Sequence, residues 1–79
     1  MSPTVFRDGG FRFFFFSREE TRLHVHVRSA DGEAKFWLAP KIEQAANYGF
    51  QTSELRNIET LIEAHYDELV AAWKAHFGG

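Results

Sequence analysis

The alternation of residues 23–27 constrains the fold more than any other segment of the chain. In Leu23-His24-Val25-His26-Val27, aliphatic residues alternate with two histidines. Successive side chains of a β-strand point to opposite faces of the sheet. We therefore expect the three aliphatic residues to face a core, and His24 and His26 to stand side by side on a solvated sheet face.

A second strand is predicted to pair with this one. Residues 33–38 also alternate, and Asp31-Gly32 is a strong signal for a two-residue turn. With those two residues in the turn, His26 lies opposite Trp37. The core face then carries Val25, Val27, Ala34, Phe36 and Leu38, and the other face carries His24, His26, Arg28, Lys35 and Trp37. A slip of one residue would mix the two sets.

An aromatic hairpin is predicted at the N-terminal end. Residues 4–7 and 11–16 are β-prone and flank the turn sequence Asp8-Gly9-Gly10. The second of these segments reads Phe11-Arg12-Phe13-Phe14-Phe15-Phe16. We expect its outward rings to contact a protein partner or RNA, because exposed aromatic patches mark interaction surfaces.

The C-terminal part is predicted to be helical. Apolar residues recur at helical spacing from Leu55 to Phe77. Thr52 precedes them and is the expected N-cap. One unbroken helix over residues 53–77 would be about 37 Å long and would overhang so small a domain. We therefore expect a break near residues 65–67. Residues 42–46 fit either a short edge strand or a turn of helix.

These elements predict an α+β fold in one domain, residues 1–79. A small antiparallel sheet of three to five strands, built from two consecutive hairpins, occupies residues 1–50. Two helices follow in residues 51–79 and pack on one face of the sheet. The core is small at this length, and nine Phe, two Trp and two Tyr supply its apolar bulk.

Composition excludes several classes of protein. The chain has no cysteine, which rules out disulfides and thiolate metal sites. The net charge of −2 rules out a global basic field, although residues 51–79 are more acidic than residues 1–50. We see no secretory signal, and the longest apolar run is too short to span a bilayer. A cytoplasmic location without a membrane partner is expected.

His24 and His26 are the candidate catalytic residues. A histidine can exchange a proton at neutral pH, and it can also contact phosphate or ligate a metal. A zinc site needs at least three protein ligands and this pair supplies two, so we expect neither a metal nor a cofactor. The alternative is that both side chains are simply solvated. His65 and His76 stand alone on the predicted helices, and we expect no functional role for them.

Arg12, Arg28, Lys35 and Trp37 are the candidate binding residues. Aromatic side chains interleaved with cations on an open sheet hold single-stranded RNA by stacking and phosphate contact. The same surface also suits a protein interface.

Four motifs resemble a family of small bacterial proteins described as domain of unknown function 4160. They are residues 3–7 (Pro-Thr-Val-Phe-Arg), 10–17, 24–27 and 32–38 (Gly-Glu-Ala-Lys-Phe-Trp-Leu). Residues 47–50, 53–55 and the terminal Leu69, Trp73 and Phe77 extend the resemblance over essentially the whole chain. Family members usually have prolines before the first histidine, where this chain has Thr21-Arg22-Leu23.

The resemblance implies a partner protein but no established reaction. Members resemble one half of a toxin–antitoxin-like gene pair, and His24 and His26 match the family's histidine pair. Two hypotheses follow. The chain is a component of such a pair that contacts or cleaves RNA through the histidine-bearing face. Alternatively, it is a non-catalytic module whose aromatic sheet face binds a cognate small protein or a second copy of itself.

Overall fold

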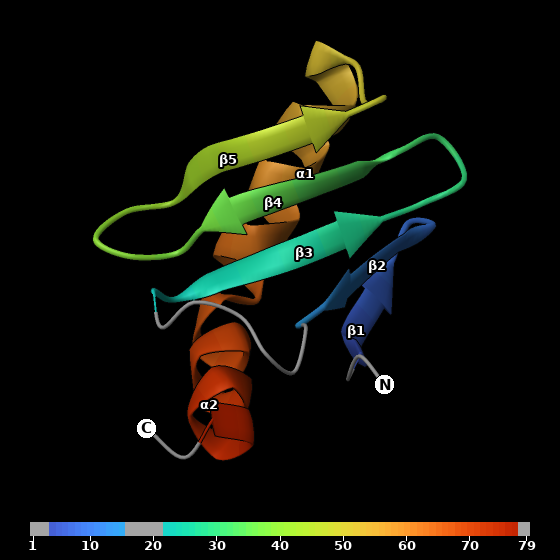
Figure 1. Ribbon diagram of the computed structural model, residues 1–79. Helices are drawn as coiled ribbons and strands as arrows, with labels where there is room; N and C mark the ends of the chain where they lie inside the picture. The colour runs from blue at the N-terminus through green and yellow to red at the C-terminus, as the bar shows by residue number, and fades with distance from the viewer. Residues whose placement is uncertain (1–3, 16–21, 78–79) are drawn as a thin grey trace.

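The computed structural model describes residues 4–15 and 22–77, which form a five-strand sheet with two helices packed on one side (Figure 1). The elements are β1 (Thr4–Asp8), β2 (Phe11–Phe14), β3 (His24–Arg28), β4 (Glu33–Trp37), β5 (Glu43–Tyr48), α1 (Thr52–Ala64) and α2 (Tyr66–Phe77). Every strand is antiparallel to its neighbours, and the order in the sheet follows the chain. The predicted α+β fold is confirmed.

The first hairpin turns where the sequence predicts. Asp8 and Phe11 are Cα partners, so Gly9 and Gly10 alone form the turn between β1 and β2. Their φ angles are 57° and 85°. A two-residue turn of this kind needs positive φ at both central positions, and glycine adopts it without strain.

The second hairpin has a different register from the predicted one. The Ser29 N–H donates to the Gly32 carbonyl at 3.0 Å, so Ala30 and Asp31 form the turn instead of Asp31 and Gly32. His26 therefore pairs with Lys35, and Trp37 pairs with His24. The error is a shift of two residues, which leaves every side chain on its predicted face.

The environment of Gly32 explains why the predicted pairing of β3 with β4 was wrong. A Cβ at Gly32 would lie 2.4 Å from the carbonyl oxygen of Tyr48 and 3.0 Å from the carbonyl carbon of Gly49. Gly32 is not among the glycines with positive φ. The glycine is needed because the backbone at the end of β5 passes very close to it, and not because the turn requires it.

Residues 43–46 belong to an edge strand, which settles that ambiguity. β5 continues through Asn47 and Tyr48, and Gly49 follows with φ of 102°. The N-cap of α1 is Gln51, one residue before the predicted Thr52. The Gln51 N–H donates to the Glu54 side chain at 3.0 Å, which satisfies a backbone donor at the helix start.

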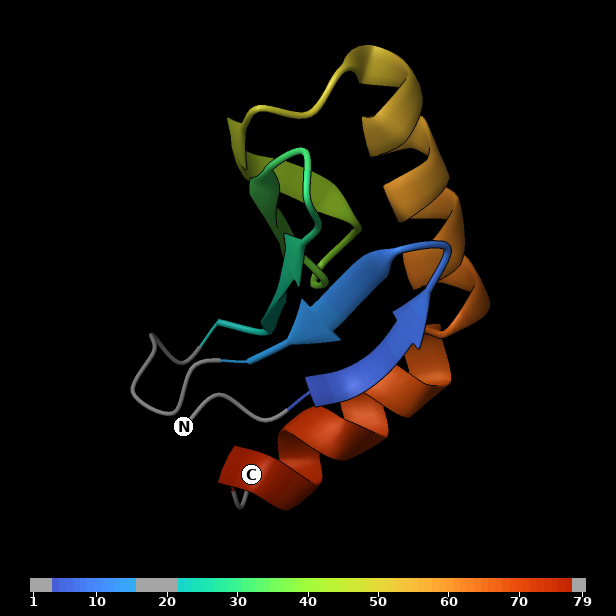
Figure 2. The ribbon, with the colours of Figure 1, turned by 90° about the vertical axis from the view of Figure 1, so that its right-hand side faces the viewer.

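The helices cover one face of the sheet and bury the core against it (Figure 2). The helix breaks at His65, inside the predicted segment, and α2 starts at the next residue. Tyr66 fixes this junction to the sheet, because its hydroxyl donates to the Leu38 carbonyl at 2.8 Å. The buried core comprises Phe13, Phe15, Val25, Val27, Ala34, Phe36, Leu38, Phe50, Ile58, Ile62, Leu69 and Trp73. Neither α1 nor α2 combines the length and apolarity that a membrane crossing requires.

Candidate functional site

Strand register gathers the predicted site residues on one side of the sheet, opposite the face that packs on the helices. Arg12 pairs with Arg28, Phe14 with His26, His26 with Lys35, and His24 with Trp37. Cα partners of paired strands project to the same face. We call this side the outer face; it carries Thr4, Arg7, Arg12, Phe14, His24, His26, Arg28, Glu33, Lys35, Trp37, Glu43, Ala46 and Tyr48.

The two histidines are buried, which corrects the prediction that they are solvated. His24 is 0 % exposed and His26 is 7 % exposed. The His24 ring lies 5.0 Å from the ring of Trp73, because α2 reaches past the beginning of β3. Its Nδ1 lies 2.6 Å from the Arg22 carbonyl oxygen, within hydrogen-bond distance. The ring is therefore held between a helix and the backbone that enters β3.

His26 is enclosed by other rings. It stacks on Phe14 with ring centroids 5.6 Å apart, and it contacts His24 edge-on at 5.2 Å. Sequence alternation could not reveal this burial, since it depends on the neighbours that the outer face supplies. The burial of both imidazoles gives no support to their predicted catalytic role.

Trp37 is a partly accessible aromatic residue of the outer face, near the beginning of β3. Its ring is half-buried, and the Arg22 guanidinium carbon lies 4.1 Å from the ring centroid. The Lys35 ammonium lies 4.5 Å from the same ring. Cations at such distances are attracted to the quadrupole of the indole. Arg22 was not among the predicted binding residues, because nothing in the sequence places it over Trp37.

Arg12 is held in a defined position. Its Nε donates to the Thr4 hydroxyl at 2.7 Å, and its guanidinium lies 4.6 Å from the centroid of the Phe14 ring. Phe14 itself is only 2 % exposed, and Phe13 and Phe15 are also buried. The expectation that outward rings of the phenylalanine run form an open patch is therefore wrong for these positions. Phe16 lies outside the described residues.

Charge is separated between the two layers. Among residues 4–15 and 22–77, the cations on or over the outer face are Arg7, Arg12, Arg22, Arg28 and Lys35, and its carboxylates are Glu33 and Glu43. The helices carry two cations, Arg56 and Lys74, against five carboxylates, Glu54, Glu59, Glu63, Asp67 and Glu68. The described part of the chain thus has a basic outer face and an acidic helical layer, although the net charge of the whole chain is −2.

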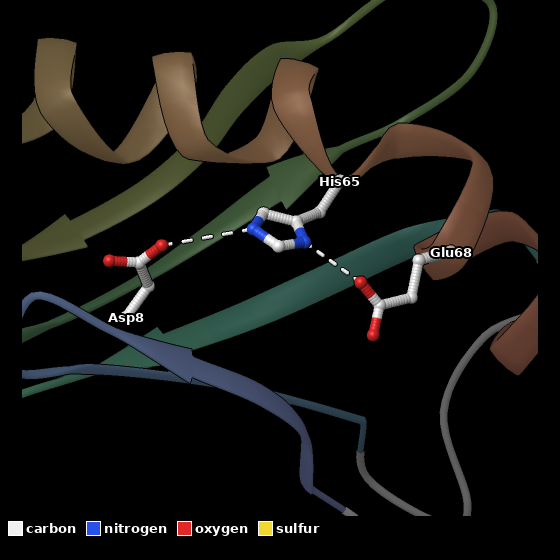
Figure 3. A network of polar contacts seen from close by, with 3 residues as sticks. All are labelled: Asp8, His65 and Glu68. Atoms are coloured by element: carbon white, nitrogen blue, oxygen red, sulfur yellow. Dashed lines mark hydrogen bonds and ion pairs between the residues drawn. The ribbon is translucent and has the colours of Figure 1, made fainter.

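A second polar cluster lies at the helix junction (Figure 3). His65 Nδ1 lies 2.8 Å from a carboxylate oxygen of Glu68, and its Nε2 lies 3.8 Å from one of Asp8. The prediction of an isolated histidine is therefore wrong. The spacing of three residues between His65 and Glu68 was a visible signal for that contact. Asp8 is distant in sequence, and nothing local indicated it.

Two shallow hollows lie near these groups. One, of about 320 Å³, is lined by Leu38, Pro40, Lys41, Ile42, Glu63 and Tyr66, and includes none of the predicted site residues. Another, of about 300 Å³ and polar, lies at the β3–β4 turn, where one cation, Arg28, and two carboxylates, Asp31 and Glu33, line it together with Tyr48. Among residues 4–15 and 22–77, no three His, Asp or Glu side chains come together in a way that could hold a metal ion.

Comparison with known proteins identifies a family but no activity. No curated protein and no solved structure matches the chain. The sequence model of the family described as "Domain of unknown function (DUF4160)" matches residues 10–74. This segment contains β2–β5, α1 and most of α2, together with all six residues predicted as catalytic or binding. The chain therefore belongs to the DUF4160 family.

Proposed function

We propose that the outer face binds single-stranded RNA, and that the chain is the RNA-contacting member of a toxin–antitoxin-like protein pair. The observation that carries the proposal is the placement of two cations, Arg22 and Lys35, at 4.1 Å and 4.5 Å from the half-buried ring of Trp37. Unpaired bases stack on aromatic rings and on guanidinium planes, while neighbouring cations hold the phosphates.

The separation of charge supports the same reading. The acidic helices repel a polyanion, and the basic outer face attracts it, so an approaching RNA is oriented toward Trp37. The favoured ligand is a single strand, because its bases are free to stack. A regular RNA duplex offers no exposed base faces along its length.

The geometry favours contact with RNA over cleavage. Acid–base catalysis requires a side chain within hydrogen-bond reach of the reacting group. His24 is 0 % exposed and His26 is 7 % exposed, so neither ring presents a nitrogen freely to a ligand on the surface. Their proposed part is to support Trp37 and Lys35 from the side, through the cross-strand pairs that His24 and His26 make with those residues.

A binding assay tests the RNA proposal. The full chain is titrated into a fluorescently labelled single-stranded RNA of about 12 nucleotides at low salt, a length within the usual site range. Lys35→Gln should weaken binding several-fold, and Trp37→Ala should weaken it about 5- to 100-fold, as expected for loss of one stacked base. Circular dichroism confirms that each variant is folded.

Lys74→Gln is the matched control. Lys74 is exposed on α2 and undergoes the same chemical change on the acidic side of the molecule. Its variant should bind RNA like the wild type. Equal losses in Lys74→Gln and Lys35→Gln, or no binding by the wild type at low salt, would exclude the outer face as an RNA site.

A protein partner is the second candidate, favoured by β5. This strand lies at the edge of the sheet, and Tyr48 at its end is 71 % exposed. An edge strand offers unpaired backbone groups to a strand of another chain. In this reading, the cognate small protein or a second copy pairs with β5. Tyr48→Ala should then reduce co-purification or self-association more than Trp37→Ala does; the opposite pattern would reject this candidate.

A further inference from the structure

Three arginines face one another across the first three strands. Arg7 of β1 is the Cα partner of Arg12 of β2, and Arg12 is the Cα partner of Arg28 of β3. We call these residues the arginine row. Neighbouring strands lie about 4.8 Å apart, so the row places three positive charges within a short span of one face. Like charges directly opposite one another on a sheet are destabilising.

The three arginines differ in how their side chains are held. The Arg12 side chain is held over Phe14 and bonded to Thr4. Arg28 Nε lies 3.8 Å from a carboxylate oxygen of Glu33, but the two side chains are 64 % and 39 % exposed. An exposed pair of this kind contributes little to stability. Arg7 is exposed as well. The guanidinium groups at both ends of the row, those of Arg7 and Arg28, are thus open to an anionic ligand.

We propose that the arginine row binds phosphate groups of the RNA backbone; this rests on the proposed function and extends it to a second contact region. Guanidinium groups bind phosphate oxygens with paired hydrogen bonds, which makes arginine suited to this task.

The position of the row sets the extent of the site. Arg28 and His24 stand at opposite ends of β3, about 13 Å apart at the rise of a strand, and Trp37 is paired with His24. One nucleotide cannot reach from the arginine row to Trp37. The RNA therefore covers several nucleotides, with a base stacked at Trp37 and phosphates held at the row.

Removing one charge from the row should have opposite effects on RNA affinity and on thermal stability. Replacing Arg7 by Gln relieves repulsion, so the variant should unfold at the same temperature as the wild type or at a higher one. The same change should weaken RNA binding about threefold to tenfold. A residue kept only for structure would show lower thermal stability and unchanged RNA affinity.

The salt dependence of binding counts the phosphate contacts. Each contact with single-stranded nucleic acid contributes about 0.7 to the slope of log K against log salt concentration. The slope is measured with the full chain and a labelled single-stranded RNA of about 12 nucleotides. Arg7→Gln and Arg28→Gln should each reduce its magnitude by about 0.7, and the double variant by about 1.4. Arg56→Gln, an exposed change on α1, should leave the slope unaltered.

Glu33→Gln provides a test in the opposite direction. Its carboxylate competes with phosphate for Arg28, so the variant should bind RNA more tightly than the wild type. Suppose that Trp37→Ala and Lys35→Gln weaken RNA binding, but Arg7→Gln and Arg28→Gln keep the wild-type salt slope. The claim that the arginine row binds phosphate would then be wrong, and the proposed function would stand. Absence of RNA binding at low salt would overturn the row and the proposed function together. Equally tight binding of poly-glutamate would identify a site for acidic polypeptides and overturn the phosphate assignment.

Discussion

His65 stacks on Phe6, with the two ring centroids 3.9 Å apart and 21° between the ring planes. Phe6 in turn stacks on the buried ring of Phe13 at 4.3 Å. A column of three rings therefore joins the junction of α1 and α2 to the first hairpin. The junction contains neither glycine nor proline, so this stacking of rings accounts for the break between the two helices.

Replacement of His65 by alanine should lower the free energy of unfolding by about 1–2 kcal/mol. The lost stack accounts for about 0.5–1.5 kcal/mol, and the exposed polar contacts with Glu68 and Asp8 for about 0.2–1 kcal/mol. His65→Phe keeps the stack and loses only the polar contacts, so it should recover most of the loss. Urea denaturation measures all three proteins.

Glu59→Ala serves as the control for this series. Glu59 is exposed on α1, and its replacement should change stability by less than about 0.5 kcal/mol. If His65→Ala is equally mild, the column of rings does not anchor the helix junction.

Gly32 should tolerate no side chain. The Cβ of alanine would lie 2.4 Å from the Tyr48 carbonyl oxygen, and the obstacle is backbone that cannot rotate away. Gly32→Ala should therefore lower the free energy of unfolding by about 1–3 kcal/mol, the usual range for overpacking. Ala30→Ser, an exposed change in the same turn, should have an effect below about 0.5 kcal/mol. Equal thermal stability of the two variants would show that β5 moves aside easily.

The burial of His24 and His26 should protect them from chemical modification. Diethyl pyrocarbonate acylates accessible imidazoles, so exposed His76 should react first and partly exposed His65 next. His24 and His26 should react only when the structure opens locally, on the order of tenfold or more slowly. Mass spectrometry of proteolytic fragments measures the rates, and urea should make the four rates similar. Rapid native-state modification of His24 would place its ring at the surface after all.

The sequence predicted those features that depend on local pattern. Alternation of residues 23–27 and 33–38 assigned each residue to its correct face, since a face depends only on whether a position is odd or even. The Gly9-Gly10 turn followed from the demand for positive φ. The helix break at His65 followed from length alone, because one straight helix does not fit a small domain.

The remaining features depend on contacts between distant segments. The pairing of β3 with β4 was two residues out, since the role of Gly32 is set by the backbone near Tyr48. The burial of His24 depends on its contact with Trp73. The position of a cation over Trp37 depends on the path of the backbone at Arg22, just before β3. The arginine row could be recognised only from the pairing of β1 with β2, which the sequence of one strand does not reveal.

The electrostatic character of the outer face can be measured without any RNA. Trp73→Phe leaves Trp37 as the single tryptophan, and quenching of its fluorescence by ions reports the local potential. Arg22 and Lys35 lie close to the Trp37 ring, so iodide should quench its emission more strongly than caesium does. Salt near 1 M, where the screening length is about 3 Å, should remove most of this difference. Lys35→Gln in the same background should reduce the difference, whereas Lys74→Gln should leave it unchanged. Equal quenching by the two ions at low salt would mean that no positive field surrounds Trp37, and the attraction of RNA to this face would lose its physical basis.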